Sequence, residues 1–287
     1  KFVFKVEKLS FSYPKNQSNT IKAISFEIKK GEIFGFLGPS GAGKSTTQKI
    51  LIKLLDDYEG LITYDGKDLK LSRESFYEDI GVSFEMPIHF SKLTAAENID
   101  FFKKLYKNQA DTDALLKSVG LFEDKDKMVG EYSKGMKIRL NFVRAMLNNP
   151  KMLFLDEPTN GLDPVNAMVL KNLIKDYRAN GGTVFITSHI MADIDQLCDR
   201  VAFIVDGEIK EIDSPRNLKI RYGKRMISVE YKENNHTETA YFEMDNLKDN
   251  LAFFEILKTK DIETIHTGET TLEEIFIKVT GVGLNHG

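Results

Sequence analysis

The sequence predicts an α/β protein with a core built around a glycine-rich loop, an antiparallel β subdomain, an inserted helical subdomain and a small C-terminal α+β extension. Three patterns lead to this prediction. The loop follows a short apolar stretch at residues 32–37 and precedes residues 50–55, where leucine and isoleucine recur at helical spacing. A helical pattern over residues 93–150 interrupts the strands, which suggests an inserted subdomain. Near residue 220 the pattern changes again, which indicates an appended domain.

The glycine-rich loop fits the phosphate-binding pattern G-x-x-x-x-G-K-[ST]. Its glycines let backbone N–H groups approach a polyphosphate closely. We expect Lys44 to reach the β- and γ-phosphates and Ser45 to offer its hydroxyl to Mg²⁺, while the start of the following helix favours the remaining negative charge. The residues expected to hold the nucleotide are Gly38, Pro39, Ser40, Gly41, Ala42, Gly43, Lys44, Ser45 and Thr46.

Composition limits the possible functions. A chain of 287 residues can bury a full core, and 40 Lys+Arg against 43 Asp+Glu give a net charge of -3, which offers no electrostatic argument for nucleic acid. Cys198 is the only cysteine, so no intrachain disulfide can form, which fits a reducing cytosol. No apolar run approaches the ~18–20 residues that span a bilayer, and the N-terminus lacks the layout of a signal peptide. We therefore expect a chain that is soluble by itself and serves a membrane process only by docking to another protein.

The chain opens with two alternating segments, residues 2–13 and 21–28, which predict an antiparallel hairpin against the core. Tyr13, at the end of the first segment, is placed to stack on an adenine ring, a contact worth only ~0.5–1.5 kcal/mol beyond burial. The alternative is an ordinary core tyrosine. The pattern also predicts strands at residues 60–64, 80–84, 152–156, 183–187, 201–205 and 208–212, a helix up to about residue 178, and, in the tail, strands at 226–231, 239–242 and 262–266 with helices at 247–257 and 272–279.

Several polar residues follow predicted strands or open predicted helices. Ser133 is placed as the N-cap of a helix, which alone is a weak signal because such capping is ordinary. Asp156 and Glu157 end an apolar strand behind the phosphate-binding loop, where Mg²⁺ and an attacking water would sit. His189 follows the strand at 183–187, at the edge where open α/β sheets bind ligands. The remaining histidines are interpreted as structural: His89, His236, His266 and His286.

With these residues in hand, the chain resembles the ATP-binding subunits of ATP-binding cassette (ABC) transporters over residues 1 to about 220. The resemblance implies a P-loop NTPase core of the RecA-like type, a cassette at residues 1–220 with its helical subdomain at about 87–150, and an accessory domain at 224–287. The tail is similar to the extension of ABC-2-type exporter ATPases. The motifs occur in fixed order: Tyr13, the Walker A loop Gly38 to Thr46, Glu85 at the Q-loop position, the signature Ser133 to Lys137, Asp156 of Walker B, Glu157, Asp163 of the D-loop and the switch His189.

The resemblance implies ATP and Mg²⁺ as cofactors and ATP hydrolysis as the reaction. Two cassettes, identical or different, would pack head to tail, so that Ser133 and the N–H of Gly135 contact the γ-phosphate held by the other subunit. The catalytic residues would be Lys44, Glu157, which orients or deprotonates the attacking water, and His189, which contacts the γ-phosphate. The expected metal-binding residues are Ser45, Glu85 and Asp156.

Two motifs differ from the family pattern. The signature usually reads Leu-Ser-Gly-Gly-Gln, and the Q-loop usually carries a glutamine. Tyr132, Lys134 and Met136 replace the leucine, the first glycine and the glutamine of the signature, and Glu85 stands at the glutamine position. Ser133 and Gly135, the pair expected to contact phosphate, are retained. No expected catalytic group is lost.

The leading interpretation is an ATPase subunit that drives a membrane exporter through a transmembrane permease, on the cytoplasmic face. The apolar segment 86–90, with Leu93, is expected to receive a short helix of that permease, and ordinary packing under the helical subdomain is the alternative. A soluble ABC ATPase acting on DNA or the ribosome is the second function considered, but the long coiled coil and the second cassette typical of those classes are missing. A P-loop kinase or GTPase is disfavoured because Asp-Glu after an aliphatic strand, with a downstream Ser-His, is not their arrangement. The sequence also contains no Asn-Lys-x-Asp for guanine.

Overall fold

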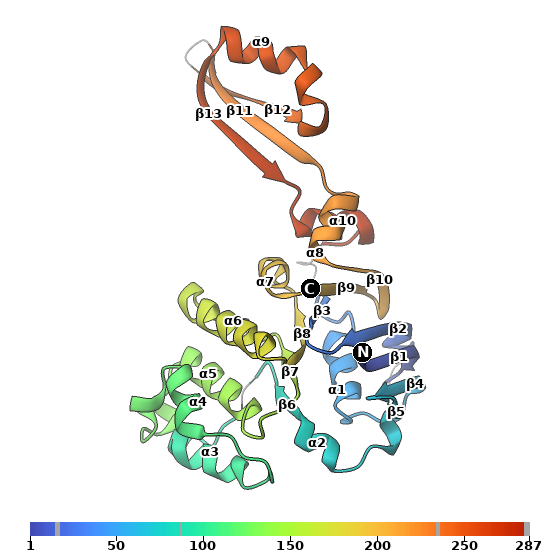
Figure 1. The fold of residues 1–287 in the computed structure, drawn as a ribbon, viewed down its shortest axis with the longest axis vertical. Coiled ribbons are helices and arrows are strands. Elements are labelled where there is room, and N and C mark those ends of the chain that lie inside the picture. The colour runs from blue at the N-terminus through green and yellow to red at the C-terminus, as the bar shows by residue number, and fades with distance from the viewer. Residues whose placement is uncertain (15–17, 87, 234–235, 284–287) are drawn as a thin grey trace. The chain divides into compact units, whose positions relative to one another are not determined.

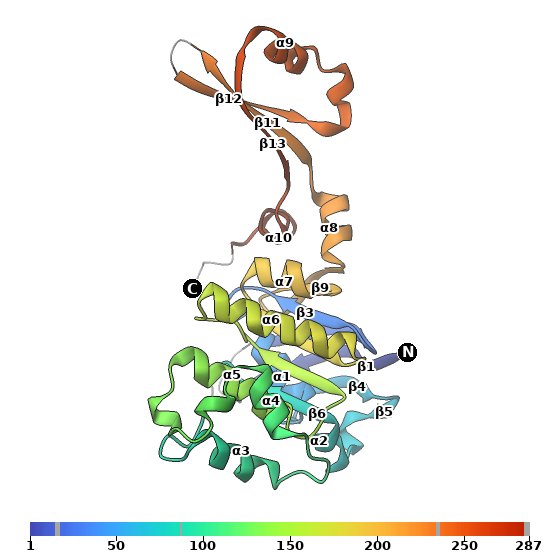
Figure 2. The ribbon, with the colours of Figure 1, turned by 60° about the vertical axis from the view of Figure 1, so that its left-hand side comes forward.

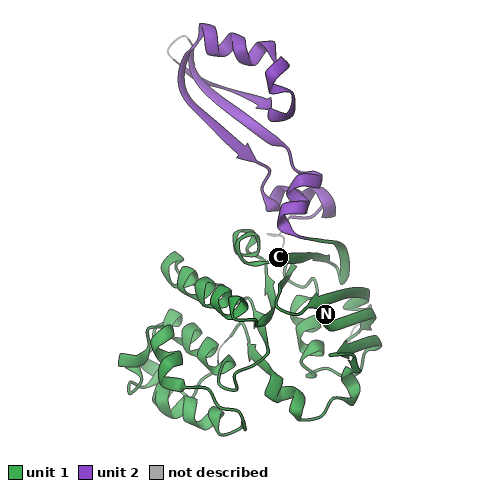
Figure 3. Cartoon of the chain, in the orientation of Figure 1, with its two compact units in different colours: residues 1–213, 284–287 green, residues 214–283 purple. Residues whose placement is uncertain are grey.

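The structure is a computed structural model that describes residues 1–14, 18–86, 88–233 and 236–283. Residues 1–213 form one compact unit and residues 214–283 a second one (Figure 3). The cassette was predicted to extend to about residue 220, whereas α8, Pro215–Tyr222, belongs to the second unit, where it contacts α10, Leu272–Thr280.

The first unit is organised around a six-stranded sheet in the order β10-β9-β3-β8-β7-β6. Five strands run parallel, and β10 pairs antiparallel with β9. Every residue of β3, β7 and β8 is buried, which explains why these strands read as continuous apolar runs instead of alternating ones. The strands are β3 Ile33–Leu37, β6 Ile80–Ser83, β7 Met152–Asp156, β8 Thr183–Ser188, β9 Arg200–Val205 and β10 Glu208–Asp213.

A four-stranded antiparallel sheet, in the order β2-β1-β4-β5, completes the β structure of this unit. It confirms the predicted hairpin, and Phe4 joins it to the core by packing its ring at 5.1 Å from Tyr64 and 5.9 Å from Phe154. Asp65 and Gly66 both have positive φ, 47° and 81°, as a tight Asp-Gly hairpin turn requires. The strands are β1 Phe2–Phe11, β2 Ile21–Lys29, β4 Glu59–Tyr64 and β5 Lys67–Asp68.

The helical part of the first unit contains three short helices, α3 Ala95–Lys103, α4 Thr112–Ser118 and α5 Lys134–Ala145. The side chains of Thr94, Asp111 and Ser133 cap their N-termini. Figures 1 and 2 show these green helices grouped on one side of the unit, away from β1, β2, β4 and β5. The other elements are α1 Lys44–Leu51, α2 Ser75–Asp79, α6 Pro164–Ala179, α7 Met191–Leu197 and the 3₁₀ turns η1 Leu69–Leu71, η2 Phe122–Asp124 and η3 Val129–Glu131.

The helix after the glycine-rich loop is shorter than predicted. The apolar spacing extended it to Leu55, but α1 ends at Leu51 because Lys53 adopts a left-handed conformation with φ of 60°. Leu54 is exposed, whereas Leu55 packs against the core from outside the helix. Apolar spacing alone does not detect this change of backbone direction.

The second unit is a three-stranded antiparallel sheet, in the order β12-β11-β13, with α9 Leu251–Thr259 packed on it. Its core contains Ile227, Val229, Phe242 and Phe253. The predicted helix at 247–257 starts later, because Asn250 caps α9 and a 3₁₀ turn, η4 Met244–Asp249, precedes it. The strands are β11 Arg225–Glu233, β12 His236–Glu243 and β13 Asp261–Glu269.

Candidate active site

The residues of the candidate site follow three parallel strands and lie at one edge of the central sheet. The glycine-rich loop follows β3, Glu157 follows β7 and His189 follows β8. Because the carboxyl ends of parallel strands meet at the same edge, residues more than a hundred positions apart come together there. A cavity of about 470 Å³ opens at this edge, lined by Tyr13, Thr20, Ser40, Gly41, Gly43, Lys44, Ser45, Thr46, Glu85, Glu157, Asn160 and His189.

Close packing explains the glycines of the loop. A Cβ on Gly38 would lie 2.1 Å from the carbonyl oxygen of Ile204, and one on Gly43 would lie 2.5 Å from Cδ1 of Ile21. Gly43 also has φ of 105°, which L side chains rarely adopt. The Nζ of Lys44 donates to the carbonyl oxygens of Gly38 at 2.7 Å and Pro39 at 3.1 Å, so the loop curls around the ammonium group. Neighbouring strands and this ammonium therefore hold the loop in shape.

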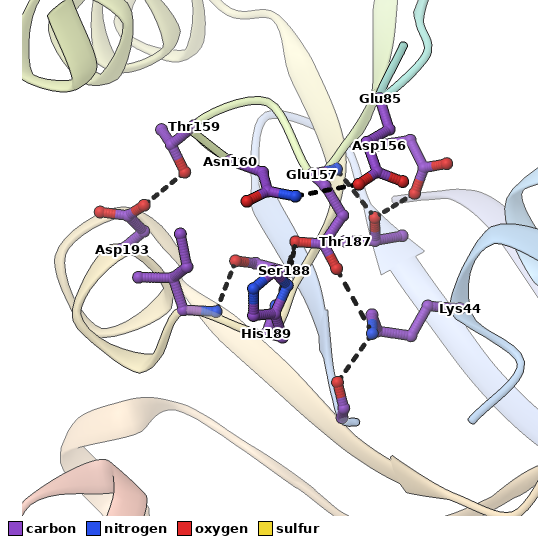
Figure 4. Close-up of polar contacts among 12 residues, drawn as sticks. Lys44, Glu85, Asp156, Glu157, Thr159, Asn160, Thr187, Ser188, His189 and Asp193 are labelled. Atoms are coloured by element: carbon purple, nitrogen blue, oxygen red, sulfur yellow. Dashed lines mark hydrogen bonds and ion pairs between the residues drawn. The ribbon is translucent and has the colours of Figure 1, made fainter. Parts of the chain in front are cut away.

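Lys44, Glu157 and His189 form a continuous chain of polar contacts (Figure 4). The Nζ of Lys44 lies 3.4 Å from Oε1 of Glu157, and Nδ1 of His189 lies 2.8 Å from Oε2. The backbone N–H of His189 also donates to Oε2, at 3.2 Å. The side chains of Lys44 and Glu157 are only 6% and 7% exposed, so each charge is paired where water is scarce. The carboxylate is thus held between a cation and an imidazole.

Glu157 has an uncommon backbone conformation, with φ of 47°. Such left-handed conformations in residues other than glycine persist only where the surroundings impose them, and they cluster at functional sites. Here the backbone N–H of Glu157 donates to both the carbonyl oxygen and Oγ1 of Thr187, each at 3.1 Å. The end of β8 therefore sets the direction in which the Glu157 side chain leaves its strand.

Asp156 lies beside Ser45. The Ser45 hydroxyl donates to Oδ1 of Asp156 at 3.0 Å, and the Thr187 hydroxyl donates to the same oxygen. Burial raises the pKa of Asp156, and the two hydroxyl donors oppose part of that rise. Nearby, Oε1 of Glu85 accepts a hydrogen bond from Nδ2 of Asn160 at 2.9 Å.

These oxygens fit Mg²⁺ better than other common metals. Within the described ranges no cluster of three or more His, Cys, Asp or Glu side chains could by itself hold a metal ion. Mg²⁺ does not need such a cluster, because it usually takes one or two carboxylates and completes its shell with waters and substrate phosphates. The Ser45 hydroxyl and the Asp156 carboxylate are that kind of partial set, and Ser45 and Glu85 both line the cavity.

The signature residues lie apart from this cavity. The Ser133 side chain is exposed and accepts from the backbone N–H of Met136 at 3.2 Å, which makes it the predicted N-cap of α5. Neither Ser133 nor Gly135 is among the residues that line the cavity of the described chain. A Cβ on Gly135 would lie 3.2 Å from Nδ2 of Asn166, so the starts of α5 and α6 are close together. Tyr132, at the leucine position, is buried and donates to the carbonyl oxygen of Asp124 at 2.7 Å.

Tyr13 lines the cavity, as an adenine-contacting residue would. Its hydroxyl lies 3.2 Å from Oγ1 of Thr46, and its ring meets Phe11 edge-on at 4.9 Å. The sequence reasoning missed Asn160 and Thr187. Thr187 carries a detectable signal, a hydroxyl close to the end of a buried strand, whereas Asn160 is one polar loop residue among several.

Three of the four histidines interpreted as structural lie within the described residues. His89 has a structural role, since its Nε2 lies 3.0 Å from the Lys137 carbonyl oxygen, and burial lowers its pKa to about 4. His236 and His266 are exposed in the second unit. His286 lies outside the described residues.

Comparison with known proteins places this geometry in a family. The family described as ABC transporter matches residues 21–160. The fluoroquinolones export ATP-binding protein of Mycobacterium tuberculosis (strain ATCC 25618 / H37Rv) is 50% identical over 97% of this chain and 93% of its own length. The chain belongs to the ATP-binding subunits of ABC transporters. The ABC subunit also matches, over residues 225–269, the family described as fluoroquinolone efflux ABC transporter C-terminal domain.

Other relatives and solved structures agree. The bacitracin transport ATP-binding protein BcrA of Bacillus licheniformis is 37% identical over 77% of the ABC subunit and 73% of its own length. The solved ATP-binding subunit of an ABC transporter superposes with a TM-score of 0.69 at 26% identity, covering 77% of this chain and 93% of that one. A dimeric ATP-binding cassette, solved in a post-hydrolysis state with ADP and Pi, gives 0.66 at 25% identity, covering 74% and 98%.

These findings confirm the predicted P-loop NTPase fold and the predicted activity. The ABC subunit binds and hydrolyses ATP, and its relatives favour a transporter over the soluble cassette acting on DNA or the ribosome. Among the described residues, no helix is long and apolar enough to cross a membrane.

Proposed function

We propose that this ABC subunit powers an exporter, and that fluoroquinolones or compounds of similar chemistry are its cargo. The observation that carries the proposal is 50% identity, over nearly the whole of both chains, to a protein named for fluoroquinolone export. Relatives named for bacitracin and lantibiotic transport support export more broadly. The cargo itself is selected by the membrane partner, so its assignment rests on this similarity and not on the cavity.

The site geometry supports a division of labour during hydrolysis. Glu157 would orient and deprotonate the attacking water, because it is the carboxylate that lies within reach of both Lys44 and His189. A γ-phosphate in contact with Lys44 would lie beside Glu157, since the two side chains are 3.4 Å apart. His189 would contact the same phosphate and hold the carboxylate through Nδ1.

The nucleotide would be held by Gly38 to Thr46, with Tyr13 against the adenine. Ser45, Asp156 and Glu85 would hold Mg²⁺, which supplies positive charge to neutralise the phosphates. Ser45 and Asp156 already lie 3.0 Å apart, so one cation can contact both oxygens.

The second half of each nucleotide site would come from another cassette, identical or different, packed head to tail. Ser133 and Gly135 lie at the start of α5, where backbone N–H groups and the helix dipole attract a phosphate. They do not line the cavity of their own chain, so they are free to face the γ-phosphate of a partner.

The membrane partner would dock on the segment after Glu85, on the cytoplasmic face. Met86 and Ile88 are 77% and 83% exposed. Phe90 is 45% exposed, and its ring packs edge-on against Phe101 and stacks with Phe102. Exposed apolar side chains gathered in this way usually mark an interaction surface, and an apolar helix of the permease would cover them. Pro87 of the predicted segment lies outside the described residues.

Charged substitution tests this docking surface. Ile88→Glu should release the subunit from membranes by more than about tenfold while ATP binding stays unchanged, since a buried unpaired carboxylate costs more than ~1.4 kcal/mol. Leu71→Glu, at a residue 79% exposed elsewhere in the first unit, is the matched control. Membrane association that survives Ile88→Glu would place the docking surface elsewhere.

The export proposal is tested in inside-out vesicles that contain the ABC subunit and its copurified permease. ATP should drive accumulation of a fluorescent fluoroquinolone, and a Glu157→Gln complex should not. A complex that hydrolyses ATP without moving fluoroquinolone would refute this cargo and leave the ATPase assignment intact.

A further inference from the structure

A buried polar cluster joins the loop after Glu157 to the helix after His189 (Figure 4). Its centre is Asp193 in α7, which is 6% exposed. One oxygen, Oδ2, accepts from the hydroxyl of Thr159, which is 4% exposed. The other, Oδ1, lies 2.9 Å from Nζ of Lys171 in α6, and Lys171 also donates to Gln196 at 2.9 Å. The carboxylate therefore joins three elements through directional contacts.

Stability alone does not explain this cluster. Removing two charges from water is costly, and replacing a buried ion pair with apolar side chains is often neutral or stabilising. Hydrogen bonds to a carboxylate, in contrast, fix distances and angles. The cluster is therefore better suited to hold the three elements in one arrangement than to strengthen the fold.

The positions of Thr159 and Asp193 in the sequence show which residues the cluster restrains. Thr159 is two residues after Glu157, and Asp193 is four residues after His189. The backbone N–H of Asp193 donates to the carbonyl oxygen of Ile190 at 3.2 Å, so the turn that follows His189 is helical and tied to the Asp193 position. Consequently, the contact between Thr159 and Asp193 closes a ring that also contains the contact between Glu157 and His189.

The ring completes the restraint on Glu157. On the strand side, Thr187 holds its backbone N–H. On the loop side, the contact of Thr159 with Asp193 holds the left-handed backbone conformation of Glu157. A change of φ at Glu157 would move the residues that follow it and break this contact. The same anchor places Asn160, the next residue, 2.9 Å from Glu85.

We propose that Asp193, acting through Thr159, is a positioning residue that sets the contact between Glu157 and His189 in the hydrolytic site. The inference rests on the proposed roles of those two residues. Asp193 touches neither nucleotide nor water in this scheme, and its effect on catalysis passes through the loop and the turn that it joins.

Thr159→Val tests the proposal because valine keeps the shape of threonine and removes only the donor to Asp193. We expect kcat for ATP hydrolysis to fall about tenfold, because small misplacement of a catalytic group is costly. The KM for ATP should stay within about twofold, since the nucleotide loop is untouched. Thr159→Ser, which restores a hydroxyl, should recover most of the rate. Gln196→Ala, which removes a partner of Lys171 alone, is the matched control and should leave kcat unchanged.

A double-mutant cycle with His189→Ala separates positioning from packing. If Thr159 acts through the contact of Glu157 with His189, Thr159→Val should lower kcat by less than about twofold once His189 is gone. Losses that multiply would overturn the proposal. So would a Thr159→Val protein with a lower melting temperature and a normal kcat, which would leave the cluster a packing role only.

The outcomes also distinguish this inference from the proposed function. If Glu157→Gln abolishes hydrolysis and Thr159→Val does not reduce it, only the inference fails. If Glu157→Gln hydrolyses normally, the proposed catalytic role fails first. Should Thr159→Val not fold, Thr159→Ala answers the same questions, because it also removes the donor to Asp193, and the same cycle applies.

Discussion

The two surfaces of this ABC subunit that we propose to face phosphate are built in different ways. The surface at the end of the central sheet contains Lys44 and Glu157, which are 6% and 7% exposed and paired with each other. The signature surface at the start of α5 offers an exposed serine and backbone N–H groups, and among the described residues the hydroxyl of this serine bonds only to its own helix. Ionised groups that act in a water-poor site need partners before the substrate arrives, whereas a helix start needs none. In the arrangement that we propose, one chain therefore supplies the ionisable groups of a site, and its partner supplies a neutral helix start that can bind an anion.

The largest expected effect is on the sheet side. Glu157→Gln should lower the hydrolysis rate by ~10²–10⁴, because it removes the proposed general base while preserving shape. ATP should still bind, and the variant should accumulate as an ATP-bound dimer, because hydrolysis is what separates the cassettes. Phosphate release and size-exclusion chromatography with ATP and Mg²⁺ measure both effects. Glu59→Gln, at an exposed strand residue, is the control, and near-normal phosphate release from Glu157→Gln would contradict the assignment.

The signature side should behave differently. Ser133→Ala should slow hydrolysis by about 10–100-fold, the loss expected for one hydrogen bond to a charged group, yet leave ATP binding by the monomer unchanged. Loss of a helix cap also costs ~1 kcal/mol of stability, so Asp111→Ala, which uncaps α4, is the matched control.

A mixing experiment tests the head-to-tail arrangement directly. Lys44→Ala should be nearly inactive, and Ser133→Ala should keep the loss of about 10–100-fold expected above. Their mixture should hydrolyse ATP faster than either variant alone, because one site of the mixed dimer then has an intact loop and an intact signature. A mixture as inactive as its components, with mixed dimers present, would mean that both surfaces serve the nucleotide of their own chain.

Acid should affect the signature side through His89. Its Nε2–H donates to the carbonyl oxygen of Lys137, in the first turn of α5, and its Nδ1 faces the guanidinium of Arg144 at 3.5 Å. Burial is the main reason that the pKa of His89 falls to about 4, against ~6.5 in an unfolded chain. Between these pH values the imidazole of His89 is protonated in the unfolded state but not in the folded state. The free energy of unfolding therefore decreases as the pH falls from about 6.5 to 4.

His89→Gln should therefore flatten this pH dependence, since glutamine keeps a donor for Lys137 and does not titrate. Melting temperatures at pH 7, 5.5 and 4.5 measure the difference, with His266→Gln, at an exposed strand residue, as the control. An equal loss of stability in both variants would show that other groups dominate the acid response.

The smallest effect is expected at Glu85. Its Oε1 accepts from Asn160 at 2.9 Å, and the carbonyl oxygen of a glutamine can do the same. Glu85→Gln should change basal hydrolysis by less than about tenfold, ~1.4 kcal/mol of barrier, while altering the stimulation of hydrolysis by the assembled transporter. A loss of basal hydrolysis as severe as that of Glu157→Gln would show that Glu85 is part of the catalytic centre.

The sequence by itself determined the fold class, the central strands and most members of the site. Buried parallel strands must be continuously apolar, a loop around phosphate must contain glycine at fixed spacing, and helix starts require capping side chains, so each of these features leaves a local pattern. The strand Met152–Asp156 and the cap at Ser133 could be predicted for this reason. The error at Leu54 and Leu55 marks the limit, because apolar spacing continues past Lys53 although the backbone turns there.

Only the tertiary structure decided how these parts meet. The chain of contacts from Lys44 through Glu157 to His189, the left-handed backbone at Glu157 and the anchoring of Thr159 by Asp193 depend on strands and helices far apart in the sequence. The separation of Ser133 from the cavity likewise follows from where the helical subdomain packs. Local patterns report the environment of a residue and its immediate neighbours, whereas these contacts arise from the order of strands in the sheet, which sets which loops share an edge.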